Sequence, residues 1–329
     1  MDFFSEIYGN SELKKTLSSL IDGGKLSHAY LLSGPEGSGK KTIALAAAAK
    51  MASKSADEAT CRRIVLGHCP DVMVIKSPED KKTTGVDSVR EFIGTVALAP
   101  DELDFKMYIF DMADKLTVQA QNALLKVIEE PPRNVYIFLL CKEMSSLIPT
   151  VRSRVQTLFT ERLSPSKIRE FFKASGTADV SSERFAFASR MCMGAIGKAA
   201  ALMNDDTAFD VYSSVKKTVA LQADKIIGAS YFDFLSGIMS EASDKDRFSL
   251  MLDYMLSAYR DLIEAKFDAE TESIFYEKDH ASDLAEKTSA EMLEMSAEAV
   301  SKIKYGLSFN TNLTITAAVL SEKLWAAAG

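Results

Sequence analysis

A glycine-rich segment with two lysines is the part of the sequence whose residue types and spacing most clearly suggest chemistry. It reads Gly-Pro-Glu-Gly-Ser-Gly-Lys-Lys over residues 34–41, after the apolar run 29–33 and at the start of the alanine-rich stretch 40–51. Residues 29–33 are predicted to form a buried strand, and residues 40–51 a helix. Backbone N–H groups of such a loop surround phosphate oxygens, the helix N-terminus adds its positive dipole, and Lys40 would reach the outer phosphates. We interpret the segment as a Walker A phosphate-binding loop and not as a chance glycine-rich turn.

Two positions depart from what nucleotide hydrolysis needs. The residue after the Walker lysine normally carries a hydroxyl that ligates Mg²⁺, but Lys41 stands there and Thr42 comes one position later. The predicted strand 107–111 ends in Asp111, the expected metal-site aspartate, and Met112 follows, which cannot accept a proton from water. The sequence therefore predicts that ATP or ADP binds weakly or not at all and that Mg²⁺ is not bound.

Three nearby residues have ordinary structural interpretations. Asp114 should lie past the end of the strand as a turn or cap residue. Cys141 ends another predicted strand, where a polar side chain could help to place the water, and it is interpreted as a small buried core residue. Lys142 fits that polar role no better. The residues predicted to contact nucleotide, in a site that has lost part of its apparatus, are Gly34, Gly37, Ser38, Gly39, Lys40, Lys41, Thr42 and Asp111.

Strand and helix patterns alternate over the first 160 residues, which predicts an α/β domain with a mostly parallel sheet. The expected strands are 29–33, 71–75, 107–111, 135–141 and 155–159, and the expected helices are 11–22, 40–51, 86–97 and 117–130. A polar loop is expected before the second strand. From residue 166 onward only helical periodicity is visible, with a break near 194–205 and long helices at 245–266, 283–304 and 310–327. We predict an α/β domain at 1–160, a small helical domain at 161–205 and an all-helical domain at 206–329.

The composition is that of a soluble globular protein. Hydrophobic residues make up 47% and charged residues 26% of the 329 residues, and the formal net charge of -7 argues against a dedicated, strongly basic nucleic-acid binder. The sequence shows no apolar stretch long enough to span a membrane and no signal-peptide pattern. Its four cysteines are too scattered for a disulfide scaffold, so a reducing cytoplasm is expected.

Three further segments together resemble the clamp-loader branch of the AAA+ family. Residues 111–117 read Asp-Met-Ala-Asp-Lys-Leu-Thr, and residues 122–132 read Asn-Ala-Leu-Leu-Lys-Val-Ile-Glu-Glu-Pro-Pro, a run highly specific to that branch. Residues 147–155 read Leu-Ile-Pro-Thr-Val-Arg-Ser-Arg-Val and resemble its Ser-Arg-Cys box, with valine in place of the cysteine. The similarity covers about residues 5–205 by motif, and the remainder by helical pattern and length.

The resemblance implies a fold and a role. The fold would be an α/β AAA+ P-loop NTPase domain with a parallel sheet, then a small helical lid domain, then an all-α collar domain for oligomerisation. A motor subunit of this branch should keep a hydroxyl after the Walker lysine, a glutamate after the Walker B aspartate and a sensor arginine in the lid. This chain has Lys41, Met112 and Gly197 at those positions, and Lys198 beside Gly197 is interpreted as a solvated helix residue. The three losses agree with a subunit that assists hydrolysis elsewhere.

The same resemblance assigns Arg154 to the arginine finger, which in this family reaches the γ-phosphate held by a neighbouring subunit. Such a finger neutralises charge that develops during phosphoryl transfer, an effect worth ~10³–10⁵ in rate in other systems. Arg152 is the competing candidate, and a salt-bridged surface arginine is the ordinary alternative. The implied partners are the tau/gamma motor subunits and a delta subunit in a hetero-pentamer, the sliding clamp and, indirectly, primed DNA, with no membrane.

Zinc is not expected. ATPase domains of this branch often carry a four-cysteine zinc module before the second strand, and only Cys61 falls on a family cysteine. Together with His68 and Cys69 it supplies at most three ligands, whereas a structural zinc site needs four. These thiols are interpreted as free groups in a degenerate loop.

The sequence thus predicts a non-motor clamp-loader subunit with little or no ATPase activity of its own. It would support ATP-dependent loading of the sliding clamp onto primed DNA during replication. The alternative is a self-sufficient AAA+ ATPase motor with an atypical site, in which Thr42 and Asp114 serve as makeshift metal and water groups.

Overall fold

The computed structural model describes residues 3–76, 86–224, 230–267, 273–307, 309 and 311–328. The chain forms two compact units, one made of residues 1–171 with 194–198 and the other of residues 172–193 with 199–329. The first unit holds the sheet, and within the described residues the second is helical. The finer division into three domains stays a prediction.

The sheet of the first unit has five strands, all parallel where they pair, in the order β2-β3-β4-β1-β5. The strands are β1 (Ala29–Ser33), β2 (Val72–Ile75), β3 (Lys106–Phe110), β4 (Val135–Cys141) and β5 (Gln156–Phe159). The predicted parallel sheet is confirmed, and the bounds of β2, β3 and β5 differ by one residue from the prediction. Asp111 therefore lies just past β3, where its N–H still donates to the Ile75 carbonyl.

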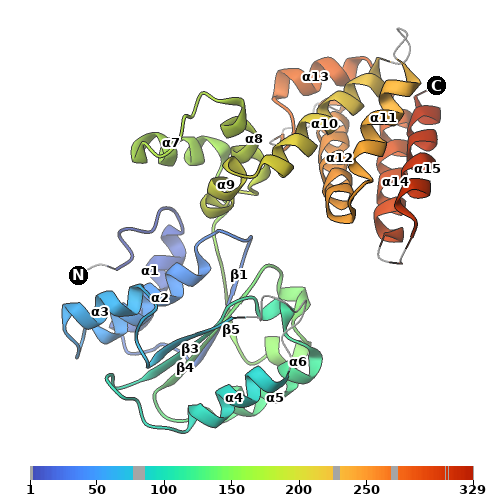
Figure 1. Cartoon of the computed structure of the whole chain (residues 1–329). Coiled ribbons are helices and arrows are strands. Elements are labelled where there is room, and N and C mark those ends of the chain that lie inside the picture. Colours follow the sequence, from blue (N-terminus) through green and yellow to red (C-terminus); the bar gives the residue numbers. More distant parts are fainter. Residues whose placement is uncertain are drawn as a thin grey trace. The chain divides into compact units, whose positions relative to one another are not determined.

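Helices cover both faces of this sheet (Figure 1). On one face pack α1 (Ser11–Asp22), α2 (Lys40–Ala52) and α3 (Glu58–Val65), and on the other α4 (Val86–Val96), α5 (Val118–Glu129) and α6 (Pro149–Arg152). Successive strand residues point to opposite faces, so Tyr30 and Leu32 join the first core and Ala29 and Leu31 the second. Burial on both faces explains why β1, β3 and β4 appear in the sequence as nearly continuous apolar runs.

Three sequence predictions are wrong in detail. The segment predicted as a polar loop before β2 contains α3, which Asp57 caps by accepting from the Thr60 N–H. The break predicted near 194–205 is occupied largely by α9 (Ile196–Met203). The single helix predicted at 283–304 is two helices, α13 (Lys278–Glu286) and α14 (Ala290–Gly306). At α3 and α14 the polar residues that cap the helix, Asp57 and Ser289, were not distinguished from a loop or from helix interior. At α9 the two glycines at 194 and 197 suggested a break, although Gly197 lies within the helix.

The second unit is built from helices packed side by side. Besides α13 and α14 it contains α8 (Glu183–Met191), α10 (Asp206–Ala223), α11 (Tyr231–Glu241), α12 (Lys245–Lys266) and α15 (Leu313–Ala327), with α7 (Pro165–Ser175) leading in from the first unit. The long helix α12 packs against α10, α13 and α14, and α15 packs against α11 and α14. A buried polar group sits among them, because the Gln222 amide donates to the Leu324 carbonyl and accepts from the Tyr259 hydroxyl. The predicted all-helical C-terminal region is confirmed for the described residues.

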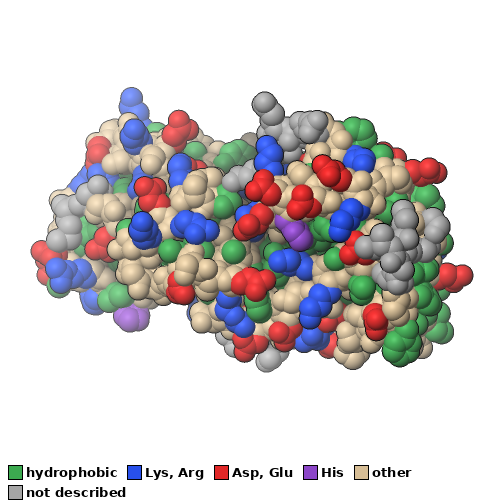
Figure 2. All heavy atoms as spheres, turned by 90° about the horizontal axis from the view of Figure 1, so that it is seen from above, with side chains coloured by type: hydrophobic (Ala, Val, Ile, Leu, Met, Phe, Trp, Pro, Cys, Tyr) green, Lys and Arg blue, Asp and Glu red, His purple; other side chains and the backbone are tan. Residues whose placement is uncertain are grey.

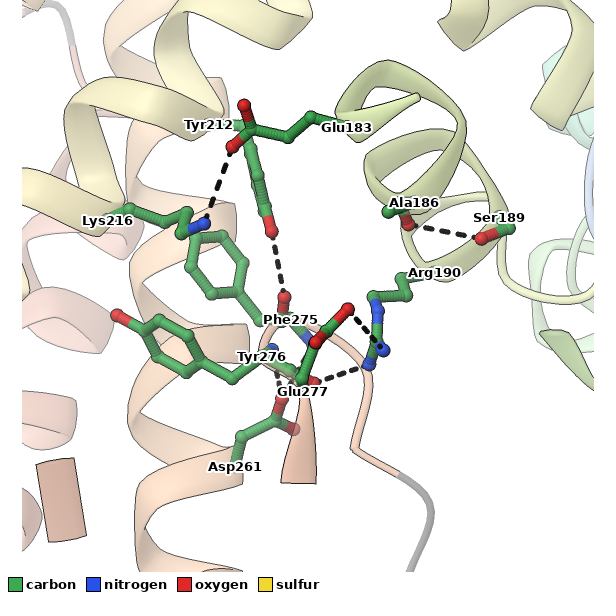
Figure 3. A network of polar contacts seen from close by, with 10 residues as sticks. All are labelled: Glu183, Ala186, Ser189, Arg190, Tyr212, Lys216, Asp261, Phe275, Tyr276 and Glu277. Carbon is green, nitrogen blue, oxygen red and sulfur yellow. Dashed lines mark hydrogen bonds and ion pairs between the residues drawn. The ribbon is translucent and has the colours of Figure 1, made fainter. Parts of the chain in front are cut away.

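A buried carboxylate fastens the segment before α13 to α12 (Figure 3). Asp261 on α12 is completely buried, and its two oxygens accept from the backbone N–H groups of Ile274, Phe275 and Tyr276 at 3.0, 2.6 and 2.9 Å. On the other side of this segment, the Arg190 guanidinium from α8 donates to the Tyr276 carbonyl. The carboxylate therefore satisfies three backbone donors in a segment that has no regular secondary structure of its own.

The surface carries charges of both signs. On the face in Figure 2, acidic and basic side chains are intermixed. None of the described helices is long and apolar enough to cross a membrane.

Candidate nucleotide-binding site and the exposed Arg154

A cleft of about 350 Å³ opens at the carboxyl ends of β1, β3 and β4, where the loop after β1 enters α2. Parallel sheets place ligand sites at this edge, because the loops that follow the strands meet there. The cleft brings together most residues that the sequence predicted to contact nucleotide. Its lining consists of Glu36, Gly37, Gly39, Lys40, Lys41, Thr42, Asp111, Met112, Asp114, Leu140, Cys141, Lys142 and Gly197.

Lys40 is bonded to its own loop. Its ammonium donates to the carbonyls of Gly34 and Pro35, both at 2.7 Å. Burial lowers the pKa of this ammonium from its ordinary value, against the opposing effect of nearby acidic groups. A nucleotide phosphate would have to replace two charge-assisted hydrogen bonds before it could recruit Lys40.

Gly37 and Gly197 lie in direct backbone contact. The Gly197 N–H donates to the Gly37 carbonyl at 3.0 Å, and Gly37 has a φ of 75°. A Cβ on Gly197 would lie 2.9 Å from the Gly37 carbonyl oxygen, and a Cβ on Gly37 would lie 2.2 Å from the backbone nitrogen of Lys198. The position at which the family resemblance expects a sensor arginine therefore has no room for a side chain unless the phosphate loop moves.

Two residues that sequence reasoning missed also hold the loop. The Asn10 amide donates to the Ser38 carbonyl, and the Thr160 hydroxyl donates to the Ser38 hydroxyl at 2.9 Å. Asn10 in turn accepts from the N–H of Glu161 and donates its own N–H to the Glu161 carboxylate. The only sequence signal for this arrangement was a polar residue directly before α1 and another directly after β5.

Asp114 and Cys141 lie where the sequence predicted, the first in a turn and the second in the core. Met112 has a φ of 63°, in the left-handed region, and it begins the short 3₁₀ turn Ala113–Lys115 in which Asp114 lies. The Asp114 Oδ1 atom is buried and has no hydrogen-bond partner among the described residues.

Cys141 is buried as expected, and burial raises the pKa of its thiol. Lys142 forms an ion pair with Glu36 at 2.7 Å, and this hydrogen bond is the main reason why the pKa of Glu36 is lowered.

The three candidate zinc ligands do not form a metal site in the described part of the chain. Cys61 lies inside α3 and is buried, as is Cys69. No group of three or more histidine, cysteine or acidic side chains that could hold a metal ion is found among the described residues. Burial raises the pKa of both thiols, which disfavours the thiolate form that binds metals.

Arg154 lies on the surface just after α6. Its Nε forms an ion pair with the Glu129 carboxylate at 2.6 Å, and its Nη1 donates to the Thr150 carbonyl at 3.1 Å. Arg152 differs, because its side chain is half-buried and its Nε is buried without a hydrogen-bond partner among the described residues. Of the two candidates for a finger, Arg154 is the more exposed residue.

Comparison with known proteins shows where this arrangement belongs. Residues 9–164 match the family described as DNA polymerase III, delta subunit. The chain is 28% identical over 269 residues to the DNA polymerase III subunit delta' of Bacillus subtilis, covering 79% of each chain. The chain is homologous to clamp-loader subunits of DNA polymerase III. This confirms the resemblance read from residues 111–155, which within the clamp-loader branch is to the delta-prime subunit of bacterial DNA polymerase III.

Two further similar proteins differ in how much of their own length aligns with this chain. The DNA polymerase III subunit tau of Bacillus subtilis is 34% identical over 172 residues, which is 50% of this chain and 30% of tau. A solved Thermotoga maritima protein related to the gamma subunit aligns with 96% of this chain and 99% of its own, at 15% identity and a TM-score of 0.47. The chain thus spans about a third of the tau relative that it matches.

The Mg²⁺ dependence of nucleotide binding tests the effect of Lys41. We expect wild-type protein to bind ATP weakly and equally with Mg²⁺ or EDTA, because the Lys41 ammonium occupies the place of the metal-ligating hydroxyl. Lys41→Thr should make binding in Mg²⁺ about tenfold tighter than in EDTA, equivalent to about 1.4 kcal/mol. Calorimetric titration measures this, with Lys41→Ala as the control that removes the charge without adding a ligand. A wild-type protein whose affinity already rises with Mg²⁺ would contradict the assignment.

Proposed function

We propose that the chain is a non-motor subunit of the DNA polymerase III clamp loader. It assembles with the tau/gamma motor subunits and the delta subunit in a hetero-pentamer, and it supports ATP-dependent loading of the sliding clamp onto primed DNA during replication. It contacts primed DNA indirectly and acts in the cytoplasm. Residues 161–205 serve as the lid and residues 206–329 as the collar through which the subunits associate.

Within the assembly, Arg154 acts as an arginine finger in trans. The observation that carries this proposal is the exposed Arg154 guanidinium, held at the surface by Glu129 and the Thr150 carbonyl. The chain's own cleft supports the same division of labour. In that cleft Met112 stands in place of a base for the attacking water, and the Lys40 ammonium is bonded to carbonyls of its own loop. Gly197, at the position of the sensor arginine, packs directly against Gly37. We propose that this cleft binds ATP or ADP weakly or not at all, without Mg²⁺, and that the chain binds no zinc.

The isolated chain is expected to show no appreciable ATP turnover. Combined with tau/gamma and delta subunits, it should form a complex that loads the clamp onto primed DNA, and omission of this chain should abolish loading. Phosphate release and clamp retention on circular primed DNA measure the two activities. Clamp loading that proceeds equally well without the chain would contradict the proposal.

One observation favours the alternative of a self-sufficient ATPase motor. Asp114 lines the cleft together with Asp111, and its Oδ1 has no hydrogen-bond partner among the described residues. A carboxylate in that place could orient a water or accept its proton. Steady turnover by the isolated chain that both Lys40→Ala and Asp114→Asn abolish would establish this alternative in place of the non-motor role.

A further inference from the structure

We infer that Glu129 is a positioning residue for Arg154, which sets the direction in which the guanidinium is presented to the neighbouring subunit. The inference rests on the proposed function of Arg154 as a finger and adds to it the residue that orients the finger. It also gives a physical role to the first glutamate of the Glu-Glu-Pro-Pro sequence at residues 129–132.

The contacts of the guanidinium divide it into an engaged and an open side. Nε is paired with the Glu129 Oε1 atom, and Nη1 donates to the Thr150 carbonyl and, at 3.2 Å, to the Ser153 hydroxyl. Nη2 has no hydrogen bond to any residue that the structure describes. Because the guanidinium is planar, fixing Nε and Nη1 also fixes the plane and the direction of Nη2.

Helix α5 holds the finger segment at two points. Near the start of α5, the Gln121 carboxamide accepts from the Ile148 N–H at 2.8 Å and donates to the Ser146 carbonyl. At the end of α5, Glu129 pairs with Arg154. Between them, Val151 of α6 is buried in the core to which α5 contributes. The segment that carries Arg154 is therefore attached to one rigid element both before and after α6.

The prolines explain why Glu129 can serve this purpose. α5 ends at Glu129, and Pro131 and Pro132 follow, which cannot continue a helix because they lack an N–H and clash with the preceding turn. The two prolines therefore fix the position at which α5 ends. A carboxylate at a helix C-terminus is unfavourable by itself, because it adds to the negative end of the dipole. Pairing with a cation offsets that effect, so Glu129 and Arg154 are each better placed with the other than alone.

The Glu129–Arg154 ion pair is not expected to contribute much to the stability of the fold. Both side chains are exposed, with 41% of Arg154 and 45% of Glu129 accessible, and exposed ion pairs contribute little to folding. An arginine with free rotamers must be ordered when it meets a phosphate, and prior orientation removes that requirement. We therefore expect the effect of Glu129 on the rate in the neighbour's site and not on unfolding.

The test uses the reconstituted clamp loader with tau/gamma, delta and primed DNA. Glu129→Ala should lower kcat for ATP on the order of tenfold and leave KM within about twofold, because misorientation affects the reaction and not nucleotide capture. Glu129→Gln should recover most of kcat, since its amide oxygen can still accept from Nε. Glu130→Ala is the matched control, because this neighbouring exposed carboxylate forms no ion pair within the described part of the chain, and it should behave as wild type.

Combining substitutions separates this inference from the proposed function. In an Arg154→Ala background, Glu129→Ala should cause no additional loss. If Arg154→Ala lowers turnover and Glu129→Ala leaves kcat unchanged or raises it, the positioning role is overturned and the finger stands. If Arg154→Ala itself has no effect, the finger assignment falls, and the inference falls with it. Additive losses in the double variant would also overturn the inference, because Glu129 would then act independently of Arg154.

Discussion

Replacing Arg154 with alanine is expected to lower DNA-stimulated ATP turnover at the neighbouring site of the reconstituted clamp loader on the order of 10³-fold. In phosphoryl transfer, negative charge spreads over the transferred group and the leaving oxygen, and a guanidinium supplied by a neighbour stabilises it. The cleft of this chain has Met112 where a base is needed, so we do not expect its own site to compensate. Single-turnover phosphate release from the assembled complex measures the effect without averaging over the remaining motor sites.

Two further variants test whether the guanidinium of Arg154 itself is required. Arg154→Lys keeps the charge but loses the planar fork, so it should restore only part of the activity. Arg152→Ala should leave turnover near wild type, because the Arg152 side chain is half-buried and its Nε atom is buried. The reverse result, a large loss with Arg152→Ala and none with Arg154→Ala, would transfer the finger role to Arg152. Arg154→Ala and Arg154→Lys should both assemble into the complex, since the Arg154 ion pair is exposed and contributes less than about 1 kcal/mol to folding.

Asp261→Ala is expected to destabilise the helical unit by about 3–5 kcal/mol, because it leaves three backbone N–H groups without their acceptor. Two of these donors, on Phe275 and Tyr276, belong to buried residues, and alanine cannot provide an oxygen in their place. Asp261→Asn should be less severe, because the amide keeps one acceptor oxygen but turns its NH₂ group toward a donor.

The single tryptophan of the chain makes this prediction measurable in the unit that it concerns. Trp325 on α15 packs against the rings of Tyr231 and Phe234 in the same unit as Asp261. Urea unfolding followed by its fluorescence should show a lower midpoint with an unchanged slope. Asp253→Ala is the matched control on α12, because Asp253 is an exposed carboxylate paired with Lys304 and its loss should change stability by less than about 1 kcal/mol. Equal midpoints for the Asp261 and Asp253 variants would contradict the role given to the buried carboxylate.

Local signals in the sequence were sufficient for the main elements of the fold. All five strands were predicted to within a residue at each end. For β1, β3 and β4 the reason is that each is a short apolar run that is buried on both sheet faces. Helix α12 was predicted at its observed bounds from its apolar periodicity and its polar flanks. The predictions failed where a helix is short or capped by residues that also favour turns, as at α3 and at the boundary between α13 and α14.

The sequence by itself determined which chemical groups this protein has and which it lacks: a phosphate loop followed by Lys41, an aspartate followed by Met112, and Arg154 in a box that resembles one family. Only the tertiary structure decided how these groups are held. It brought Gly37 against Gly197, Asn10 against Ser38, and Glu129 against Arg154. Periodicity and residue preference act over a few neighbouring residues, whereas these pairs are separated by 25 to 160 positions, as the residue numbers show. Their contacts depend on how strands and helices pack, and for that reason the sequence pattern could not specify them.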